Sequence, residues 1–307
     1  MRWENAIEGY WLSKARQVSD ATISDYNGTF RRFGKWIKGT AAEDITAKDV
    51  DAFLTHLDED LELAPKTVLN AWVALSSFWT WAAKELGYRH IIRDVDKPKA
   101  RPQPMLPYSE EEVRRLLDAC GRMRAYAPAS QQHTDGRRPT AYRDIAIMLV
   151  LLDCGLRASE LCALTMRDYE KKQGRFSVHH GKGDKPRVVF IGQSAQRALW
   201  RYLVTRDSLP PAAALFARSD TGGPMDRNGL RMMIERAGER AGVPGACAHR
   251  FRHTFAVNYL RNGGNIAALQ DMLGHSTLEM VRRYARLAEV DLAQAQKRAS
   301  PADNWRL

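Results

Sequence analysis

Six residues in the second half of the chain have side chains that suit chemistry at a phosphate ester. They are Arg157, Lys182, His249, Arg252, His275 and Tyr284. A phenol oxygen can attack phosphorus, guanidinium groups can pair with phosphate oxygens, and histidine or lysine can carry protons. His249 and Arg252 are three residues apart, so on a helix their side chains share one face. These residue types predict a phenol aimed at a phosphate.

Each of these residues also has a simpler structural explanation. An arginine soon after a glycine is commonly a surface or capping residue, a lysine between glycines is usually solvated, and a buried tyrosine is usually core. His249 and His253 have the i, i+4 spacing of a zinc-binding helix, but Arg250 occupies the place of the glutamate of a metalloprotease helix. Two nearby arginines would also repel a metal ion, so we expect no metal.

Helix and hairpin signals surround the candidate residues. The apolar stretch 142–153 predicts a helix that Gly155 closes, and the first arginine of the set follows soon after. Two β-prone runs, 175–180 and 187–191, flank a glycine-rich turn that contains Lys182. This pattern predicts a β-hairpin with the lysine near its tip.

The remaining helices of this half are marked by their ends. Ser109 begins a capping box and Asp226 can cap a later helix. A helix is expected over 249–263, because His249 begins an apolar-periodic run that stops at two glycines. Short helices follow over 266–273 and 277–287.

The first 95 residues predict a small bundle of four helices. Apolar residues recur every three or four positions over 21–38, Thr46 can cap the next helix, and Pro65 begins a long apolar helix that stops at Gly87. An earlier helix around Tyr10 completes the bundle.

A basic, proline-rich segment divides the chain. Prolines alternate with basic residues from 97 to 104, which excludes a helix and favours a stiff, extended linker. We therefore expect a helical unit over 1–95, a linker over 96–107, a catalytic unit over 108–287 and a C-terminal tail over 288–307. The expected fold class is mainly α with a small antiparallel β-sheet (α+β).

The positive charge is concentrated after the first helical unit. The net charge is +11, but residues 1–95 carry 12 Lys and Arg against 14 Asp and Glu, whereas residues 96–307 carry 35 against 22. Arginine outnumbers lysine in the second part, and guanidinium groups suit phosphate oxygens. The charge favours a nucleic-acid partner, although a solvated basic face would give the same count.

The composition is that of a globular protein, with 44% hydrophobic and 27% charged residues among 307. No apolar run approaches the length of a membrane span, and the start has no secretion signal, so we expect a cytoplasmic protein without a membrane partner. The four cysteines form no CxxC pair, which favours reduced thiols over disulfides or a metal site.

Considered together, the six residues and their flanking sequences resemble the tyrosine recombinases, the phage-integrase and Xer family. The likeness lies in residues 152–161, the Gly-Lys-Gly-Asp-Lys-Pro-Arg segment 181–187, the His-Arg-Phe-Arg box that opens 249–256, the Leu-Gly-His-Ser segment 273–276, and Tyr284. It covers residues 108–290, and residues 1–95 are similar to the family's SAM-like core-binding domain.

The resemblance implies a role for each residue. Tyr284 would be the nucleophile and form a 3′-phosphotyrosine, His249 would remove its proton, and Lys182 would protonate the leaving 5′-oxygen. Arg157 and Arg252 would hold the phosphate oxygens. His275 would hydrogen-bond the same phosphate, and Glu160 would orient an arginine without reacting. No cofactor, metal ion or ATP is implied.

The resemblance also implies double-stranded DNA recombination sites as the partner. Candidate DNA-binding residues are Arg31, Lys35, Lys66, Asn70, Lys97, Lys99 and Arg101. The expected assembly is a homotetramer on DNA, with a monomer as the alternative in its absence. The tail would pack on a neighbouring protomer, against the alternative of a frayed terminus. A Xer-like protein could also have a heterologous recombinase partner.

Two other functions fit parts of the pattern. A type IB topoisomerase-like enzyme would use similar residues to relax DNA, and a catalytically silent protein would only bind it. The chain's size, the Leu-Gly-His-Ser segment and the tail favour recombination, and the complete set of six residues argues against a silent protein. The sequence does not choose between chromosome dimer resolution and integration or excision of a mobile element, and it does not give the target site.

Overall fold

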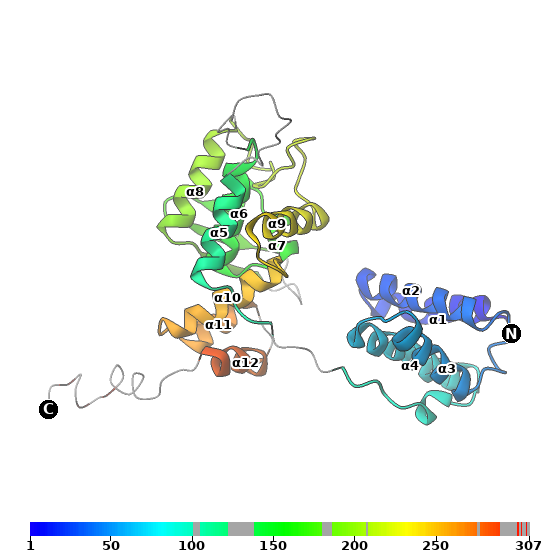
Figure 1. Cartoon of the computed structure of the whole chain (residues 1–307). Coiled ribbons are helices and arrows are strands. Elements are labelled where there is room, and N and C mark those ends of the chain that lie inside the picture. Colours follow the sequence, from blue (N-terminus) through cyan, green and yellow to red (C-terminus); the bar gives the residue numbers. More distant parts are fainter. Residues whose placement is uncertain are drawn as a thin grey trace, which may run out of the picture. The chain divides into compact units, whose positions relative to one another are not determined.

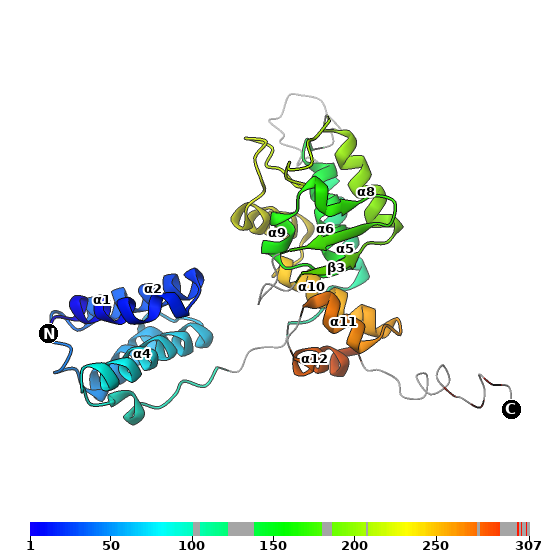
Figure 2. The same ribbon diagram turned by 180° about the vertical axis from the view of Figure 1, so that it is seen from behind.

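The computed structural model describes residues 1–100, 105–121, 138–179, 186–206, 208–274 and 277–288, together with 300, 302 and 305. The chain divides into two compact units, Met1–Pro104 and Met105–Leu307 (Figures 1 and 2). None of the described helices has the length and apolar character needed to cross a bilayer.

The first unit is a bundle of four main helices. These are α1 (Trp3–Lys14), α2 (Asp20–Trp36), α3 (Ala47–Thr55) and α4 (Pro65–Glu85), with short turns η1 (Ala15–Gln17), η2 (His56–Asp60) and η3 (Ile91–Asp94). The predicted cap is present, because Thr46 accepts from the Asp49 N–H while the Asp49 carboxylate accepts from the Thr46 N–H. The predicted four helices are confirmed.

Aromatic side chains fill the centre of this bundle. Trp3 from α1 meets Phe33 from α2 with ring centroids 5.1 Å apart and Phe78 from α4 at 4.7 Å. Its indole N–H donates to the Phe30 carbonyl at 3.1 Å. The aromatics are therefore core residues, since packing of their rings joins three helices.

The second unit contains eight α-helices and one short turn, η4 (Met166–Asp168), among the described residues. The α-helices are α5 (Glu110–Gly121), α6 (Ala141–Cys154), α7 (Ala158–Ala163), α8 (Gln193–Val204), α9 (Arg227–Ala241), α10 (Ala248–Arg261), α11 (Ile266–Leu273) and α12 (Leu278–Ala288). The predicted caps at Ser109 and Asp226 are both made. Gly155 ends α6 with a left-handed φ of 61°, as its position in the sequence predicted.

A three-stranded antiparallel sheet lies against α6 (Figure 2). Its order is β1 (Tyr169–Glu170), β2 (Arg175–Val178), β3 (Arg187–Phe190). Phe176 pairs with Val189, and both are buried. The predicted hairpin is confirmed in these two strands, the short β1 was not predicted, and the turn that contains Lys182 lies outside the described residues.

The last three helices form a small core of their own at one end of the unit (Figure 1). Phe255 of α10, Leu269 and Leu273 of α11, and Val281 and Tyr284 of α12 are buried in it. The mainly helical fold with a small antiparallel sheet agrees with the class expected from the sequence.

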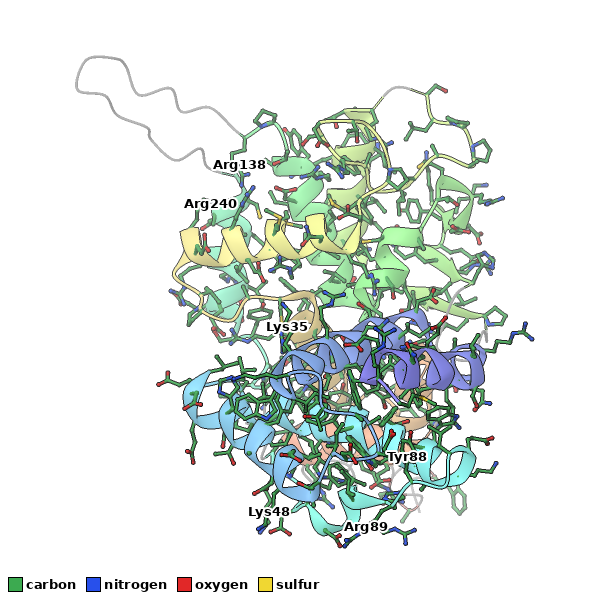
Figure 3. All side chains as sticks on the ribbon, turned by 90° about the vertical axis from the view of Figure 1, so that its right-hand side faces the viewer. Lys35, Lys48, Tyr88, Arg89, Arg138 and Arg240 are labelled. Carbon is green, nitrogen blue, oxygen red and sulfur yellow. The ribbon has the colours of Figure 1, made fainter. Side chains whose placement is uncertain are left out.

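Arg240 on α9 is a structural residue as well as a surface charge. Its Nε donates to the Ala119 carbonyl at 3.2 Å, which ties α9 to α5. Arg138 lies beside it (Figure 3), and burial followed by the Arg138 charge lowers the pKa of Arg240. Arg240 is therefore anchored in the fold and is more than a solvated surface charge.

Candidate active site

Arg157 is held where the end of α6 meets the start of α7. Its Nη1 donates to Glu160 Oε1 at 2.7 Å and its Nη2 donates to the Gly274 carbonyl at 3.2 Å. The side chain keeps 27% of its surface exposed, so it can be reached from solvent. Two anchors from different segments thus fix an accessible cation.

Glu160 is the buried anion of the site. Its side chain is 1% exposed, and its Oε2 accepts from the Arg157 backbone N–H at 2.8 Å. Both oxygens also accept from the guanidinium of Arg187. Burial would raise the pKa of the Glu160 carboxyl, but the hydrogen bonds from Arg187 and Arg157 outweigh burial and lower the pKa to about 2. The carboxylate is therefore charged throughout the neutral range.

Arg252 on α10 is almost completely buried. It is 3% exposed, and its two terminal nitrogens donate to the Gly155 and Leu273 carbonyls, each at 2.7 Å. The first carbonyl belongs to the left-handed Gly155 and the second directly precedes the left-handed Gly274, so α6 and α11 end around this guanidinium. Burial, followed by the charge of Arg157, lowers the pKa of Arg252 to about 10. The group remains protonated at neutral pH.

His249 lies one helical turn before Arg252, as the spacing predicted. The residue as a whole is exposed, but the protein around its ring, followed by the positive charge of Arg252, lowers its pKa. A lowered pKa keeps the imidazole neutral at pH 7, and a neutral imidazole can accept a proton.

Tyr284 is buried in the small core formed by α10, α11 and α12. It is 7% exposed, and its ring centroid lies 5.2 Å from that of His253, at an interplanar angle of 60°. The phenol is near enough to Arg252 to act on it electrostatically. The helices therefore bring the predicted nucleophile next to a predicted phosphate-binding arginine.

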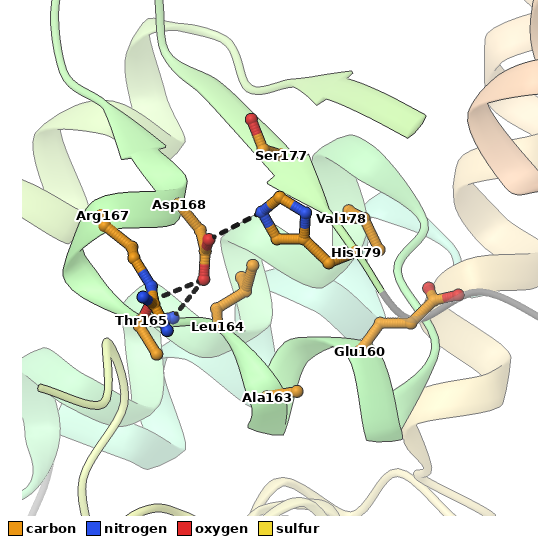
Figure 4. A pocket seen from close by; sticks show the side chains of 9 residues that line it. All are labelled: Glu160, Ala163, Leu164, Thr165, Arg167, Asp168, Ser177, Val178 and His179. Carbon is orange, nitrogen blue, oxygen red and sulfur yellow. Dashed lines mark hydrogen bonds and ion pairs between the residues drawn. The ribbon is translucent and has the colours of Figure 1, made fainter. Parts of the chain in front are cut away.

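A pocket of about 350 Å³ opens beside Glu160, near the start of the lysine hairpin (Figure 4). On its other side the Asp168 carboxylate accepts from the Thr165 N–H at 2.8 Å and pairs with His179 Nε2 at 3.1 Å. His179 directly follows β2. This hydrogen bond ties one stem of the hairpin to the segment after α7.

The structure describes five of the seven predicted site residues and brings them together. They are Arg157, Glu160, His249, Arg252 and Tyr284. Lys182 and His275 lie outside the described residues. Within the described ranges no three His, Cys, Asp or Glu side chains are close enough together to hold a metal ion.

The predicted DNA-binding residues lie on the first unit and its C-terminal extension. Arg31 and Lys35 are exposed on α2 (Lys35 is labelled in Figure 3), and Lys66 and Asn70 are exposed on the first turns of α4. Two more are exposed in the extended segment after η3: Lys97 and Lys99. Arg101 lies outside the described residues.

Sequence reasoning missed two residues of the site. Arg187 was part of the hairpin motif but received no role, and His253 was considered only as a zinc ligand. His253 is 6% exposed, and its Nε2 is buried without a hydrogen-bond partner among the described residues. A charged residue at the start of an apolar strand was the available signal for Arg187. No signal in the sequence placed His253 against Tyr284.

Comparisons with known proteins identify the family. The family model described as the phage integrase family matches residues 108–290, and that of the phage integrase N-terminal SAM-like domain matches residues 12–87. Tyrosine recombinase XerC of Pelobacter propionicus is 28% identical over 297 residues, which cover 94% of this chain and 92% of the relative. Tyrosine recombinase XerA of Thermococcus onnurineus is 31% identical over 208 residues, or 68% of this chain and 66% of the relative.

Solved structures share the fold. The Tn1549 transposon integrase in complex with a circular intermediate DNA superimposes with a TM-score of 0.75 at 19% identity, over 92% of this chain and 95% of that one. The XerH recombinase bound to its difH substrate, in a post-cleavage complex, superimposes with a TM-score of 0.66 at 20% identity, over 95% and 82%. With a family match that covers more than half of the sequence, the chain belongs to the phage integrase family of tyrosine recombinases and is a site-specific DNA recombinase.

Proposed function

We propose that the protein cleaves one strand of duplex DNA through Tyr284 and rejoins it to a new end. The phenol oxygen would bond to the scissile phosphorus while the bond from phosphorus to the 5′-oxygen breaks. The products are a 3′-phosphotyrosine and a free 5′-hydroxyl. The observation that carries this proposal is the convergence of Arg157, Arg252 and Tyr284, which come from three separated segments.

The two arginines supply the charge that the reaction needs. Negative charge grows on the phosphate oxygens as the phenol attacks, and cations fixed in advance stabilise that charge without rearranging. Arg157 is the solvent-accessible member, and Arg252 is buried and fixed by two backbone carbonyls. We assign the phosphate oxygens to this pair.

Proton transfers complete the step. An ordinary phenol is almost entirely protonated at neutral pH, so its proton must leave as the bond to phosphorus forms. His249 is the proposed acceptor, because its lowered pKa keeps it neutral. The leaving 5′-oxygen takes a proton from Lys182, and His275 donates a hydrogen bond to the phosphate. These last two roles rest on the family resemblance.

The reaction should need neither ATP nor a metal ion. A phosphotyrosine diester keeps the energy of the original phosphodiester, so attack by a 5′-hydroxyl can reverse the step. The charge that a metal ion would provide comes from the arginines. Adduct formation is therefore expected to continue in EDTA.

The first unit is proposed to hold the DNA. Arg31, Lys35, Lys66 and Asn70 are exposed on α2 and α4 and suit contacts to phosphates or bases. The extended basic segment would add phosphate contacts through Lys97, Lys99 and Arg101. The proposed location is the cytoplasm.

We propose a homotetramer on two DNA sites, with the tail over 288–307 packed on a neighbouring protomer. The Xer names of several relatives make a heterologous recombinase partner the alternative assembly. In this assembly the helical unit over 1–95 would bind the DNA and the catalytic unit over 108–287 would cleave it. The linker over 96–107 would connect the two units.

Covalent trapping on a nicked duplex tests the proposal. The short strand beyond the scissile phosphate diffuses away after cleavage, which leaves the protein attached to DNA. The wild type should form this adduct in EDTA, and Tyr284→Phe should bind the DNA but form none. Tyr259→Phe, a change at another tyrosine of the same helical region, should behave as the wild type. An adduct with Tyr284→Phe, or its loss in EDTA, would refute the assignment.

A further inference from the structure

Arg187 is a buried cation that the roles described above do not use. It is the first residue of β3, and its side chain is only 9% exposed. Charged side chains are rarely buried without a specific partner, because removal from water is costly. The contacts of this arginine therefore indicate what it does.

Both oxygens of Glu160 accept hydrogen bonds from Arg187. Nη1 lies 2.9 Å from Oε1 and Nη2 lies 2.6 Å from Oε2, which is a planar two-bond fork. The same Oε1 accepts from Arg157 Nη1, and the same Oε2 accepts from the Arg157 N–H. One buried carboxylate is thus shared by two arginines.

A third contact reaches the segment that precedes His275. Arg187 Nε donates to the Met272 carbonyl at 2.8 Å. Its Cδ would lie 3.3 Å from a Cβ added at Gly274, so the side chain packs against that glycine turn. Arg157 donates to the carbonyl of the same glycine. Arg187 therefore contacts both supports of the Arg157 side chain.

We propose that Arg187 is a positioning residue that holds Arg157 in place and leaves the charge of Arg157 available to the substrate phosphate. The inference rests on the proposed function, because it assigns Arg157 to the scissile phosphate. Arg187 itself is not expected to touch DNA.

Charge balance gives the physical reason. Arg157, Arg187 and Glu160 together carry one net positive charge. Without Arg187, the Arg157–Glu160 pair would have no net charge and would attract a phosphate only weakly. The fork also fixes the plane of the carboxylate, which a lysine cannot do with a single ammonium group.

Single-turnover cleavage of three nicked substrates tests this role. The first has the ordinary phosphodiester, the second has a neutral methylphosphonate at the scissile position, and the third has sulfur in place of the leaving 5′-oxygen. Arg187→Gln should slow cleavage of the ordinary substrate by about 10- to 100-fold, as small misplacements at a reacting centre do. On the methylphosphonate substrate, the variant should cleave within about 3-fold of the wild-type rate. This substrate builds up less negative charge in the reaction and depends less on the two arginines.

The sulfur substrate distinguishes a defect in phosphate binding by the arginines from a defect in protonation of the leaving group. Sulfur leaves without a proton donor, so it would rescue a defect in Lys182 but not one in Arg157. Rescue of Arg187→Gln by sulfur, or equal losses on all three substrates, would overturn the proposal. Arg187→Lys keeps the charge but loses the fork, and it should give an intermediate rate.

Two further variants show whether a loss of activity is specific to Arg187 or reflects unfolding of the protein. His179→Gln replaces the imidazole that pairs with Asp168 at the other stem of the hairpin, and this variant should cleave at the wild-type rate. The double variant Glu160→Gln with Arg187→Gln removes both buried charges and should lose no more activity than the worse single variant, since both act through one route. Additive losses would contradict the shared route. Wild type and Tyr284→Phe in the same assay show separately whether the proposed function holds.

Discussion

Replacing Glu160 by glutamine should destabilise the catalytic unit more than any single exposed charge does. The carboxylate is 1% exposed and receives hydrogen bonds from two guanidinium groups and one backbone N–H. Glutamine keeps one acceptor oxygen but places an NH₂ group against donors. Arg157 and Arg187 would then face each other without the anion between them.

The lowered pKa sets the size of the effect. The pKa of Glu160 falls from an ordinary 4.5 to about 2 in the folded protein. A shift of this size corresponds to about 3 kcal/mol of unfolding free energy, because one pKa unit is worth about 1.4 kcal/mol. A carboxyl with a depressed pKa contributes this stability fully above pH 4.5, and the contribution is lost as the pH falls toward 2.

Urea unfolding followed by circular dichroism measures the difference between wild type and Glu160→Gln. The variant should be about 3 kcal/mol less stable at pH 7, and the gap should narrow to about 2 kcal/mol near pH 3.5. Only the transition of the unit Met105–Leu307 should shift, because Glu160 lies in it. Glu110→Gln is the matched control, since its ion pair with Arg114 is exposed and its loss should leave the stability almost unchanged. A loss below 1 kcal/mol for Glu160→Gln, or a gap that does not depend on pH, would refute the reasoning.

Three further predictions concern Gly155, His249 and the C-terminal tail. Gly155→Ala should cost roughly 2–4 kcal/mol, because its φ is 61° and a Cβ would lie 2.4 Å from Phe255 Cδ1; Gly222→Ala, also left-handed but in open space, should cost only about 1 kcal/mol in the same unfolding assay. The cleavage rate should fall in acid with a midpoint below 6.5, the ordinary pKa of a histidine, and His249→Gln should remove this dependence; an unchanged profile in the variant would exclude this base. Deleting residues 289–307 should weaken cooperative binding to two sites more than binding to one, as gel-shift titrations would measure, and equal weakening would argue against an exchanged tail.

Local rules explain why much of the fold could be predicted from the sequence. Thr46 and Ser109 are followed three residues later by acidic side chains, and both capping boxes are made. Gly155 can adopt a left-handed φ without strain, so it ends α6 where predicted. In each case the interacting atoms are only a few residues apart, and one chain segment contains the whole signal.

Other features depend on the packing of distant segments. Asp58, Glu59 and Asp60 continue α3 in the wider turn η2, in which Leu57 is buried in the bundle. The two-residue strand β1 forms only because β2 lies beside it. Arg187 is 27 residues from Glu160 along the chain, so no local pattern could show their fork.

The same distinction applies to the catalytic residues. Their identities could be predicted because the family resemblance assigns them by motif. The positions of Arg252 between two helix-ending carbonyls, and of Tyr284 against His253, could not. Those contacts exist only after α6, α10, α11 and α12 have packed.

The most direct test of the central claim is to locate the DNA on the protein. The adduct trapped on a nicked duplex would be digested with nuclease and protease, and tandem mass spectrometry would identify the modified peptide. We expect a nucleotide linked through its 3′-phosphate to Tyr284. A nucleotide on any other residue, or one linked through a 5′-phosphate, would contradict it.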